Sequence, residues 1–242
     1  SALAQVRERI VRACAAAGRA PEEVEVIGVT KTFGPEVVAE AWEAGIRRFG
    51  ESRVQEAAFK IPQCAAGPEW HLIGHLQRNK VRPALALFTT LHAVDSFRLL
   101  DQIGADAAEA GVCPDILLEV NVSGESSKFG FAPEEAPRAV ERALGCRAVT
   151  LVGLMTMAPF CPDPGQARPV FARLRELRDR LARDFGIGLP RLSMGMSNDF
   201  EAAVREGATW VRIGSRLFGC RPTLKQTLRA RLADGGGREE EQ

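Results

Sequence analysis

Lys31 is the residue whose type and position most clearly suggest chemistry. It follows a largely apolar stretch, residues 24–30, and a threonine stands on each side of it. A charged lysine side chain at the end of a buried strand costs free energy unless it is solvated, paired with an opposite charge or engaged by a ligand. A lysine amine that is withdrawn from water becomes a nucleophile suited to capture of a carbonyl carbon. A lysine that simply extends into solvent is the alternative, and Lys31 alone does not decide between the two.

Two turns rich in small residues lie later in the chain, at residues 194–199 (MGMSND) and 213–219 (IGSRLFG). Small residues let backbone N–H groups approach an anion closely, and serine hydroxyls add further donors. Both turns are therefore candidate phosphate-binding loops. A nucleophilic lysine together with a phosphate cradle points to a phosphorylated carbonyl compound, either a sugar phosphate or pyridoxal phosphate.

Eight short β-like runs alternate with helical stretches along the chain. Several runs are nearly continuous in apolar residues, as expected for parallel strands that are covered by helices. In a chain of 242 residues this alternation predicts the α/β class and a single (β/α)8 TIM barrel. The rival is an open doubly wound sheet, which usually shows a glycine fingerprint after its first strand, and none follows here. The runs cover residues 24–30, 47–51, 70–74, 91–95, 115–121, 150–156, 191–196 and 209–214.

The segments between these runs have helical periodicity and recognisable ends. Pro35 opens one segment, and Ser96 can cap another that Gly111 closes. The stretches 163–186 and 199–207 are expected to be helical as well. A further helix over residues 3–19 is expected to cover the bottom or the side of the barrel.

Polar residues collect at the ends of the predicted strands. Active sites of TIM barrels form at the carboxyl ends of the strands, and phosphate is often bound by the loops after strands 7 and 8. The two small-residue turns fall at those strands. The polar set comprises Lys31, Glu51, Ser52, His75, Asp95, Ser96, Asn121, Thr156, Ser197, Asn198, Gly214, Ser215 and Arg216.

Ordered motifs along nearly the whole chain resemble those of the pyridoxal phosphate homeostasis proteins, also called proline synthetase co-transcribed homologues. That family is similar to the N-terminal barrel of alanine racemase without its second domain. The matching stretches are residues 29–32 (VTKT), 49–56 (FGESRVQE), 71–80 (HLIGHLQRNK), 94–96 (VDS), 120–122 (VNV), 153–158 (GLMTMA), 192–197 (LSMGMS) and 211–215 (VRIGS).

The resemblance implies that pyridoxal 5′-phosphate (PLP) is held as an internal aldimine on Lys31. It further implies that Arg212 faces the pyridine nitrogen and thereby makes the cofactor a weaker electron sink. Ser52 stands where the family usually has Asn, so a contact made by that amide would here need a water molecule. The implied cofactor-binding residues are Lys31, Ser52, Met155, Ser197, Arg212, Gly214 and Ser215.

The function that this resemblance implies is PLP homeostasis by a carrier without catalytic turnover. A PLP-dependent amino-acid racemase is the alternative, but racemases of this barrel type resemble one another in using a tyrosine base from a second domain. This sequence contains no tyrosine. His75 or Cys220 could serve as a different base. A sugar-phosphate aldolase would explain the lysine and the cradle but not the motif set.

Composition bears on nucleic-acid binding, membrane insertion, cellular compartment and metal binding. The net charge of +1 gives no basic surface for nucleic acid, and no apolar run approaches the about 18 residues that a membrane span needs. Six widely spaced cysteines without a C-x-x-C pair, and a polar start of the chain, indicate a reduced, cytoplasmic protein. His71 and His75 are spaced four apart, but a structural role is favoured over a metal site.

The expected organisation is one PLP-binding barrel over residues 1–233 and a disordered tail over residues 234–242. Lys128 lies on a loop and is either a lid residue or a solvated lysine. The expected partners are PLP and, as its recipients, PLP-dependent apoenzymes. A barrel without the racemase's second domain is expected to be a monomer.

Overall fold

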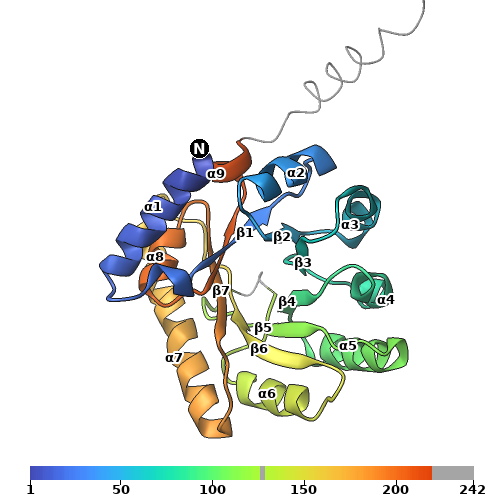
Figure 1. The fold of residues 1–242 in the computed structure, drawn as a ribbon. Helices are drawn as coiled ribbons and strands as arrows, with labels where there is room; N and C mark the ends of the chain where they lie inside the picture. The colour runs from blue at the N-terminus through green and yellow to red at the C-terminus, as the bar shows by residue number, and fades with distance from the viewer. Residues whose placement is uncertain (126–128, 220–242) are drawn as a thin grey trace, which may run out of the picture.

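Eight parallel strands form a closed barrel whose first strand pairs with both its second and its last (Figure 1). The computed structural model describes residues 1–125 and 129–219. The predicted TIM barrel is confirmed, and every predicted strand is present with its ends displaced by at most two residues. The strands are β1 (Glu25–Val29), β2 (Arg48–Glu51), β3 (Glu69–Leu72), β4 (Thr90–Val94), β5 (Asp115–Glu119), β6 (Thr150–Met155), β7 (Arg191–Met196) and β8 (Trp210–Ile213).

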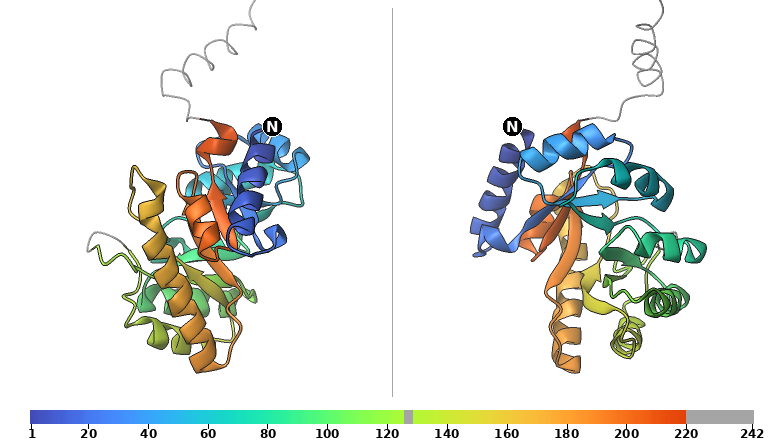
Figure 2. Two further views of the ribbon diagram at one scale, coloured as in Figure 1. Left: turned by 90° about the vertical axis from the view of Figure 1, so that its left-hand side faces the viewer. Right: turned by 45° about the vertical axis from the view of Figure 1, so that its right-hand side comes forward.

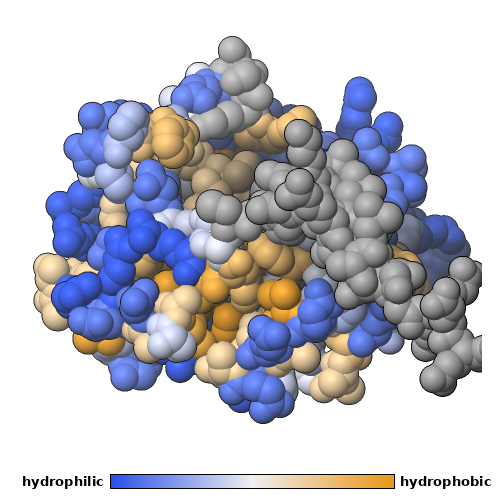
Figure 3. All heavy atoms as spheres, turned by 90° about the horizontal axis from the view of Figure 1, so that it is seen from above, coloured by the Kyte–Doolittle hydropathy of each residue, from blue (hydrophilic) through white to orange (hydrophobic). Residues whose placement is uncertain are grey.

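Helices surround the barrel, and most of them bury one face. In α7, Phe171, Leu174 and Leu177 form part of the buried face, and hydrophilic side chains line much of the rim of the molecule seen from above (Figure 3). The helices are α1 (Ala2–Ala15), α2 (Pro35–Glu43), α3 (Val54–Lys60), α4 (Val81–Leu85), α5 (Phe97–Ala110), α6 (Ala136–Leu144), α7 (Arg168–Phe185), α8 (Phe200–Arg205) and α9 (Ser215–Phe218).

Helix ends follow from local side-chain chemistry. The side chain of Ser96 accepts a hydrogen bond from the Leu99 N–H at 3.4 Å and so caps α5, as the sequence predicted. Gly111, with φ of 67°, and Gly186, with φ of 62°, end α5 and α7 in the left-handed conformation that glycine adopts without a steric penalty. The predicted helix over residues 163–186 begins with a short 3-10 turn, Pro164–Ala167, before α7.

The first helix covers the side of the barrel and is shorter than predicted. Helix α1 ends at Ala15 and not at Arg19, and it packs against α8 and α9 (Figure 2). The Arg19 guanidinium instead donates to the carbonyl oxygens of Val204 and Ala208, at 2.7 and 3.0 Å. These bonds tie the turn after α1 to the end of α8 and to the loop that leads into β8.

Strand alternation determines which side chains enter the barrel. Successive residues of a strand point to opposite faces, so every second residue of a barrel strand points inward. Glu119 comes two positions after Leu117, and Arg212 two positions after Trp210. Since Leu117 and Trp210 point into the barrel, Glu119 and Arg212 point inward as well. Lys31 follows β1 on its inward face. The apolar layer inside the barrel consists of Ile27, Ala93, Leu117, Met155 and Trp210.

Some expectations concern parts of the chain that the structure does not describe. The tail over residues 234–242, Lys128 and Cys220 all lie outside the described residues. Within the described ranges, no helix combines the length and the apolar character needed to cross a bilayer.

The close approach of β6 and β7 at Gly153 gives a first prediction. A Cβ atom at this position would lie 1.8 Å from the Arg191 carbonyl oxygen, so one backbone has to move. We expect Gly153→Ala to lower the free energy of unfolding by about 1–3 kcal/mol in chemical denaturation. Gly188→Ala is the control, because no heavy atom lies within 4 Å of a Cβ there. Equal stability of the two variants would contradict the tight β6–β7 packing.

Candidate functional site

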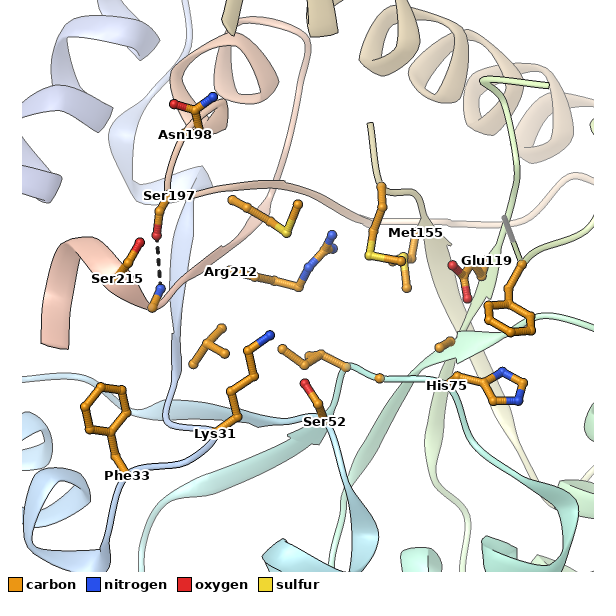
Figure 4. A pocket seen from close by; sticks show the side chains of 18 of the residues that line it. Lys31, Phe33, Ser52, His75, Glu119, Met155, Ser197, Asn198, Arg212 and Ser215 are labelled. Atoms are coloured by element: carbon orange, nitrogen blue, oxygen red, sulfur yellow. Dashed lines mark hydrogen bonds between the residues drawn. The ribbon is translucent and has the colours of Figure 1, made fainter. Parts of the chain in front are cut away.

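A cavity of about 410 Å³ opens at the carboxyl ends of the strands, and all eight strands or the loops after them contribute to its lining (Figure 4). This is the end of the barrel at which TIM-barrel sites form. The structure brings all seven sequence-predicted cofactor residues together here. They are Lys31, Ser52, Met155, Ser197, Arg212, Gly214 and Ser215.

A strained turn presents Lys31 to the cavity. The Phe33 N–H donates to the Thr30 carbonyl oxygen at 3.0 Å and closes a turn around Lys31. Thr32, the next residue, has a φ of 71°, in the left-handed region that disfavours β-branched residues. Such a conformation costs about 1–3 kcal/mol. The Thr32 N–H donates to the Glu56 carboxylate, which helps to hold this turn and directs Lys31 inward.

A second lysine, Lys60, contacts the end of β1 from outside the cavity. Lys60 is buried, and its Nζ donates to the Thr30 carbonyl oxygen and to Glu51 Oε1, both at 2.8 Å. The Thr30 hydroxyl also donates to Glu51 Oε1, at 2.7 Å. Burial raises the pKa of Glu51, and the Lys60 ammonium opposes that rise. Glu51 was grouped with the cavity residues in the sequence, but alternation directs it outward, toward α3.

The loops after β7 and β8 meet through Ser197 and Gly214. The Gly214 N–H donates to Ser197 Oγ at 3.2 Å (Figure 4). The Arg216 guanidinium donates to the Ser197 carbonyl oxygen. Gly195 makes this turn possible, because its φ is 91° and a Cβ there would lie 2.6 Å from the Ala203 Cβ. This end of the cavity therefore presents the Ser197 and Ser215 hydroxyl groups, which can donate to an anion, while the Gly214 N–H is engaged by Ser197 Oγ.

Arg212 is a buried cation at the base of the cavity, with 4% of the residue exposed. Its Nη1 donates to Ser193 Oγ at 2.6 Å and its Nη2 to the Thr156 carbonyl oxygen at 3.1 Å. Burial lowers the pKa of Arg212 to about 10, while the negative charges of Glu119 and Asp199 oppose that shift. The guanidinium consequently stays charged at neutral pH.

A hydrogen-bonded chain continues from Arg212 into the barrel. Ser193 Oγ lies 2.8 Å from His92 Nδ1, and His92 Nε2 lies 2.8 Å from His71 Nδ1. Burial holds the pKa of His92 well below its ordinary value, so the ring is neutral at pH 7. Because Ser193 accepts from Arg212, we infer that its own proton is donated to His92. The chain thus fixes the position of the guanidinium.

The opposite end of the cavity is acidic. Glu119, the last residue of β5, is 4% exposed, and we find no hydrogen bond from its carboxyl group to any residue in the described ranges. Burial raises the pKa of Glu119 to about 7; the negative charge of Asp95 adds to this rise, and Arg212 and His75 oppose it. His75 Nδ1 lies 2.7 Å from Asp95 Oδ2, and the His75 ring stacks on Phe129 with centroids 4.3 Å apart.

His71 and His75 thus have separate partners, one inside the barrel and one at the cavity mouth. Within residues 1–125 and 129–219, no group of three or more histidine, cysteine or acidic side chains is arranged to hold a metal ion.

Three other polar residues at strand ends have structural roles. Ser96 caps α5, the Asn121 amide donates to the Glu125 carbonyl oxygen, and the Thr156 hydroxyl donates to the Val120 carbonyl oxygen. Strand β5 ends two residues earlier than predicted, so its cavity residue is Glu119 and not Asn121. An acid within an otherwise apolar run was the signal for Glu119. Other lining residues that the sequence did not single out are Val29, Phe33, Ile73, Ala93, Phe129 and Met157.

The family model for the alanine racemase N-terminal domain matches residues 2–222. The fold is shared with an alanine racemase of Clostridium difficile 630 at a TM-score of 0.69 and 15% identity, over 84% of this chain and 54% of that one. Barrel and match together define the class, a (β/α)8 barrel of the alanine racemase N-terminal type.

More similar relatives identify the group within this class. The chain is 44% identical over 218 residues to the pyridoxal phosphate homeostasis protein of Aquifex aeolicus, covering 90% of this chain and 96% of that protein. The mouse protein of the same name is 37% identical over 248 residues, covering 96% and 90%. The structure of PipY from Synechococcus elongatus with PLP bound has a TM-score of 0.77 at 34% identity, covering 88% and 100%. The chain belongs to the pyridoxal phosphate homeostasis protein family, which confirms the resemblance seen in the sequence.

The raised pKa of Glu119 predicts a pH-dependent stability. An acid with a higher pKa in the folded state stabilises the fold at low pH, and that contribution is lost between about pH 4.5 and about pH 7. A shift of this size corresponds to about 3 kcal/mol. We expect Glu119→Gln to be more stable than the unmodified protein at pH 8, with little difference at pH 4.5.

The measurement is urea denaturation across this pH range. Burial also raises the pKa values of Glu51 and Asp199, so only the difference between variant and parent isolates Glu119. The charge-matched control is Glu40→Gln on the exposed face of α2. Parallel pH profiles for Glu119→Gln and the parent would show that Glu119 has an ordinary pKa.

Proposed function

We propose that this protein binds PLP in the cavity at the carboxyl ends of the strands and serves in PLP homeostasis as a carrier. The observation that carries the proposal is the meeting of Lys31, Arg212 and the Ser197–Gly214 turn in one cavity. Its family supports it, since the relatives are named for pyridoxal phosphate homeostasis and PipY has a structure with PLP bound.

The residues present fit this cofactor. A phosphate monoester needs several donors in a small space. The Ser197 and Ser215 hydroxyls supply two at one end, and the Gly214 N–H supplies a third once it exchanges Ser197 Oγ for the phosphate. The cation of Arg212 lies at the base, where an unprotonated ring nitrogen could accept from it. Met155 supplies an apolar surface for the ring, and Ser52 lines the cavity on the β2 side.

When bound, PLP supplies an aldehyde carbon that forms a covalent bond with a primary amine. Lys31 Nζ is the proposed anchor, because its turn directs it into the cavity. Arg212, which stays charged, disfavours a proton on the ring nitrogen and thereby limits electron withdrawal by the ring. Holding a reactive aldehyde tolerates this limit, whereas chemistry through a carbanion does not.

We also propose that the protein has no racemase or transaminase turnover. A two-base racemization needs a second proton acceptor, and the sequence has no tyrosine to provide it. Of the two substitutes that the sequence offers, His75 is held by Asp95 and Phe129, and Cys220 lies outside the described residues. Loss of a positioned general base typically lowers a rate by about 10² to 10⁴.

The proposal extends to the domain organisation, oligomeric state, compartment and partners of the protein. We propose one barrel domain over residues 1–233, a monomer in the cytoplasm, and PLP-dependent apoenzymes as recipients of the cofactor. Five cysteines within the described residues are free thiols, which supports a reducing compartment.

Borohydride reduction tests the assignment of Lys31. We expect protein incubated with PLP to absorb visible light, to lose that band on reduction, and to carry the adduct on the peptide that contains Lys31. Lys31→Ala should abolish the adduct, and Lys80→Ala, which changes a lysine outside the cavity, should leave it unchanged. An adduct mapped by mass spectrometry to another lysine would refute the assignment.

Hydrogen exchange at the α-carbon tests the absence of turnover. We expect PLP-loaded protein to leave the α-proton of L-alanine in place in deuterated water and to produce no D-alanine, because the second base is lacking. NMR and chiral chromatography measure both. Conversion at ordinary enzymatic rates that disappears in Lys31→Ala would establish a racemase instead of a carrier.

A further inference from the structure

The cavity has two ends of opposite electrostatic character. Ser197, Ser215 and Gly214 form the donor-rich end, and Glu119 and His75 lie across the cavity from them (Figure 4). The proposed function uses the donor-rich end and the floor, and it assigns no role to Glu119.

Glu119 is a buried carboxyl group without a hydrogen-bonding partner among residues 1–125 and 129–219. A buried polar group that lacks a partner destabilises the protein unless a ligand or water satisfies it. The charge of Arg212 acts on Glu119, but the Arg212 guanidinium donates its hydrogen bonds to Ser193 and Thr156 and not to this carboxyl group. The carboxyl oxygens of Glu119 can therefore accept hydrogen bonds from a ligand in the cavity.

The surroundings of Glu119 favour a positive charge on an alkyl stem. Asp95 adds a second negative charge near Glu119, and its pairing with His75 offsets that charge only in part. Phe129 lines the cavity beside His75, on whose ring it stacks, and adds apolar surface there. Met155 and Met157 offer apolar surface to methylene groups.

We propose that the Glu119 end of the cavity is a subsite for a primary alkylammonium group that has no carboxylate beside it, such as a lysine side chain. An α-amino acid fits poorly, because its carboxylate would lie close to Glu119 and Asp95 and be repelled. The subsite rests on the proposed function in one respect: it places an amine beside the cofactor that Lys31 holds. It thereby distinguishes lysine-like amines from free α-amino acids.

The charged groups that face Glu119 set the pH at which this subsite binds. They are Asp95 after β4, His75 after β3 and Arg212 on β8. An ammonium group binds the ionised carboxylate, so its affinity should rise as the pH increases through the pKa of Glu119. By linkage, the bound ammonium should lower that pKa.

The test uses the full chain with PLP fixed on Lys31 by borohydride, so that an added amine cannot exchange with the anchor. Glutamate carboxyl carbons carry a ¹³C label, and Glu119→Gln identifies the Glu119 signal by its loss. The probe is Nα-acetyl-L-lysine methylamide, and L-alanine is the comparison. We expect the probe to lower the pKa of Glu119 by about one unit, which is a tenfold preference for the ionised form, and L-alanine to leave it unchanged.

Affinity for the probe at pH 8, from shifts of backbone amide signals around the cavity, provides the second measurement. We expect Glu119→Gln to weaken binding about tenfold or more, Glu119→Asp to retain part of the affinity, and Glu40→Gln to bind like the parent. Equal binding of L-alanine and the probe, or parental affinity in Glu119→Gln, overturns the subsite. Failure to load PLP on Lys31 refutes the carrier proposal, and the same titrations of the unloaded protein then still decide on Glu119.

Discussion

The guanidinium group of Arg212 is buried inside the barrel, and a charge in that position has to be satisfied by neighbours from several strands. Removing a charge from water costs several kcal/mol unless hydrogen bonds and opposite charges compensate it. Ser193 of β7, the carbonyl group after β6 and the acid at the end of β5 provide this compensation. The register of these strands is therefore tied to one side chain, and the polar cavity is built around it.

The two lysines near β1 show how the barrel separates reactive from structural amines. Lys60 is buried, hydrogen-bonded to Glu51 and Thr30, and committed to joining α3 to the first two strands. Lys31 is directed into the cavity, where a soluble ligand can reach it. An aldehyde that enters the cavity therefore meets Lys31 and not Lys60, because Lys60 is buried and ion-paired.

Much of the fold could be predicted because its signals are local. Apolar runs and helix ends identified the eight strands, and the carboxyl-end rule then placed Lys31 and the two small-residue turns in one cavity. Glu119 was missed because the run continued past it to Asn121, and a shift of two residues conceals which residue reaches the cavity. The Arg212–Ser193–His92 chain could not be predicted, because its members come from three strands and no local pattern links them.

At Thr32, a backbone conformation that lowers the stability of the fold helps to place the Lys31 side chain. A positive φ at the third position of a tight turn is the natural place for glycine. The β-branched Thr32 is held in this strained conformation by its neighbours, among them the Glu56 carboxylate. Glycine would relieve that strain, but it would also let the neighbouring residue sample more directions. A more stable protein could thus be a poorer holder of its ligand. The turn thus gives up folding stability in exchange for a fixed direction of the Lys31 amine.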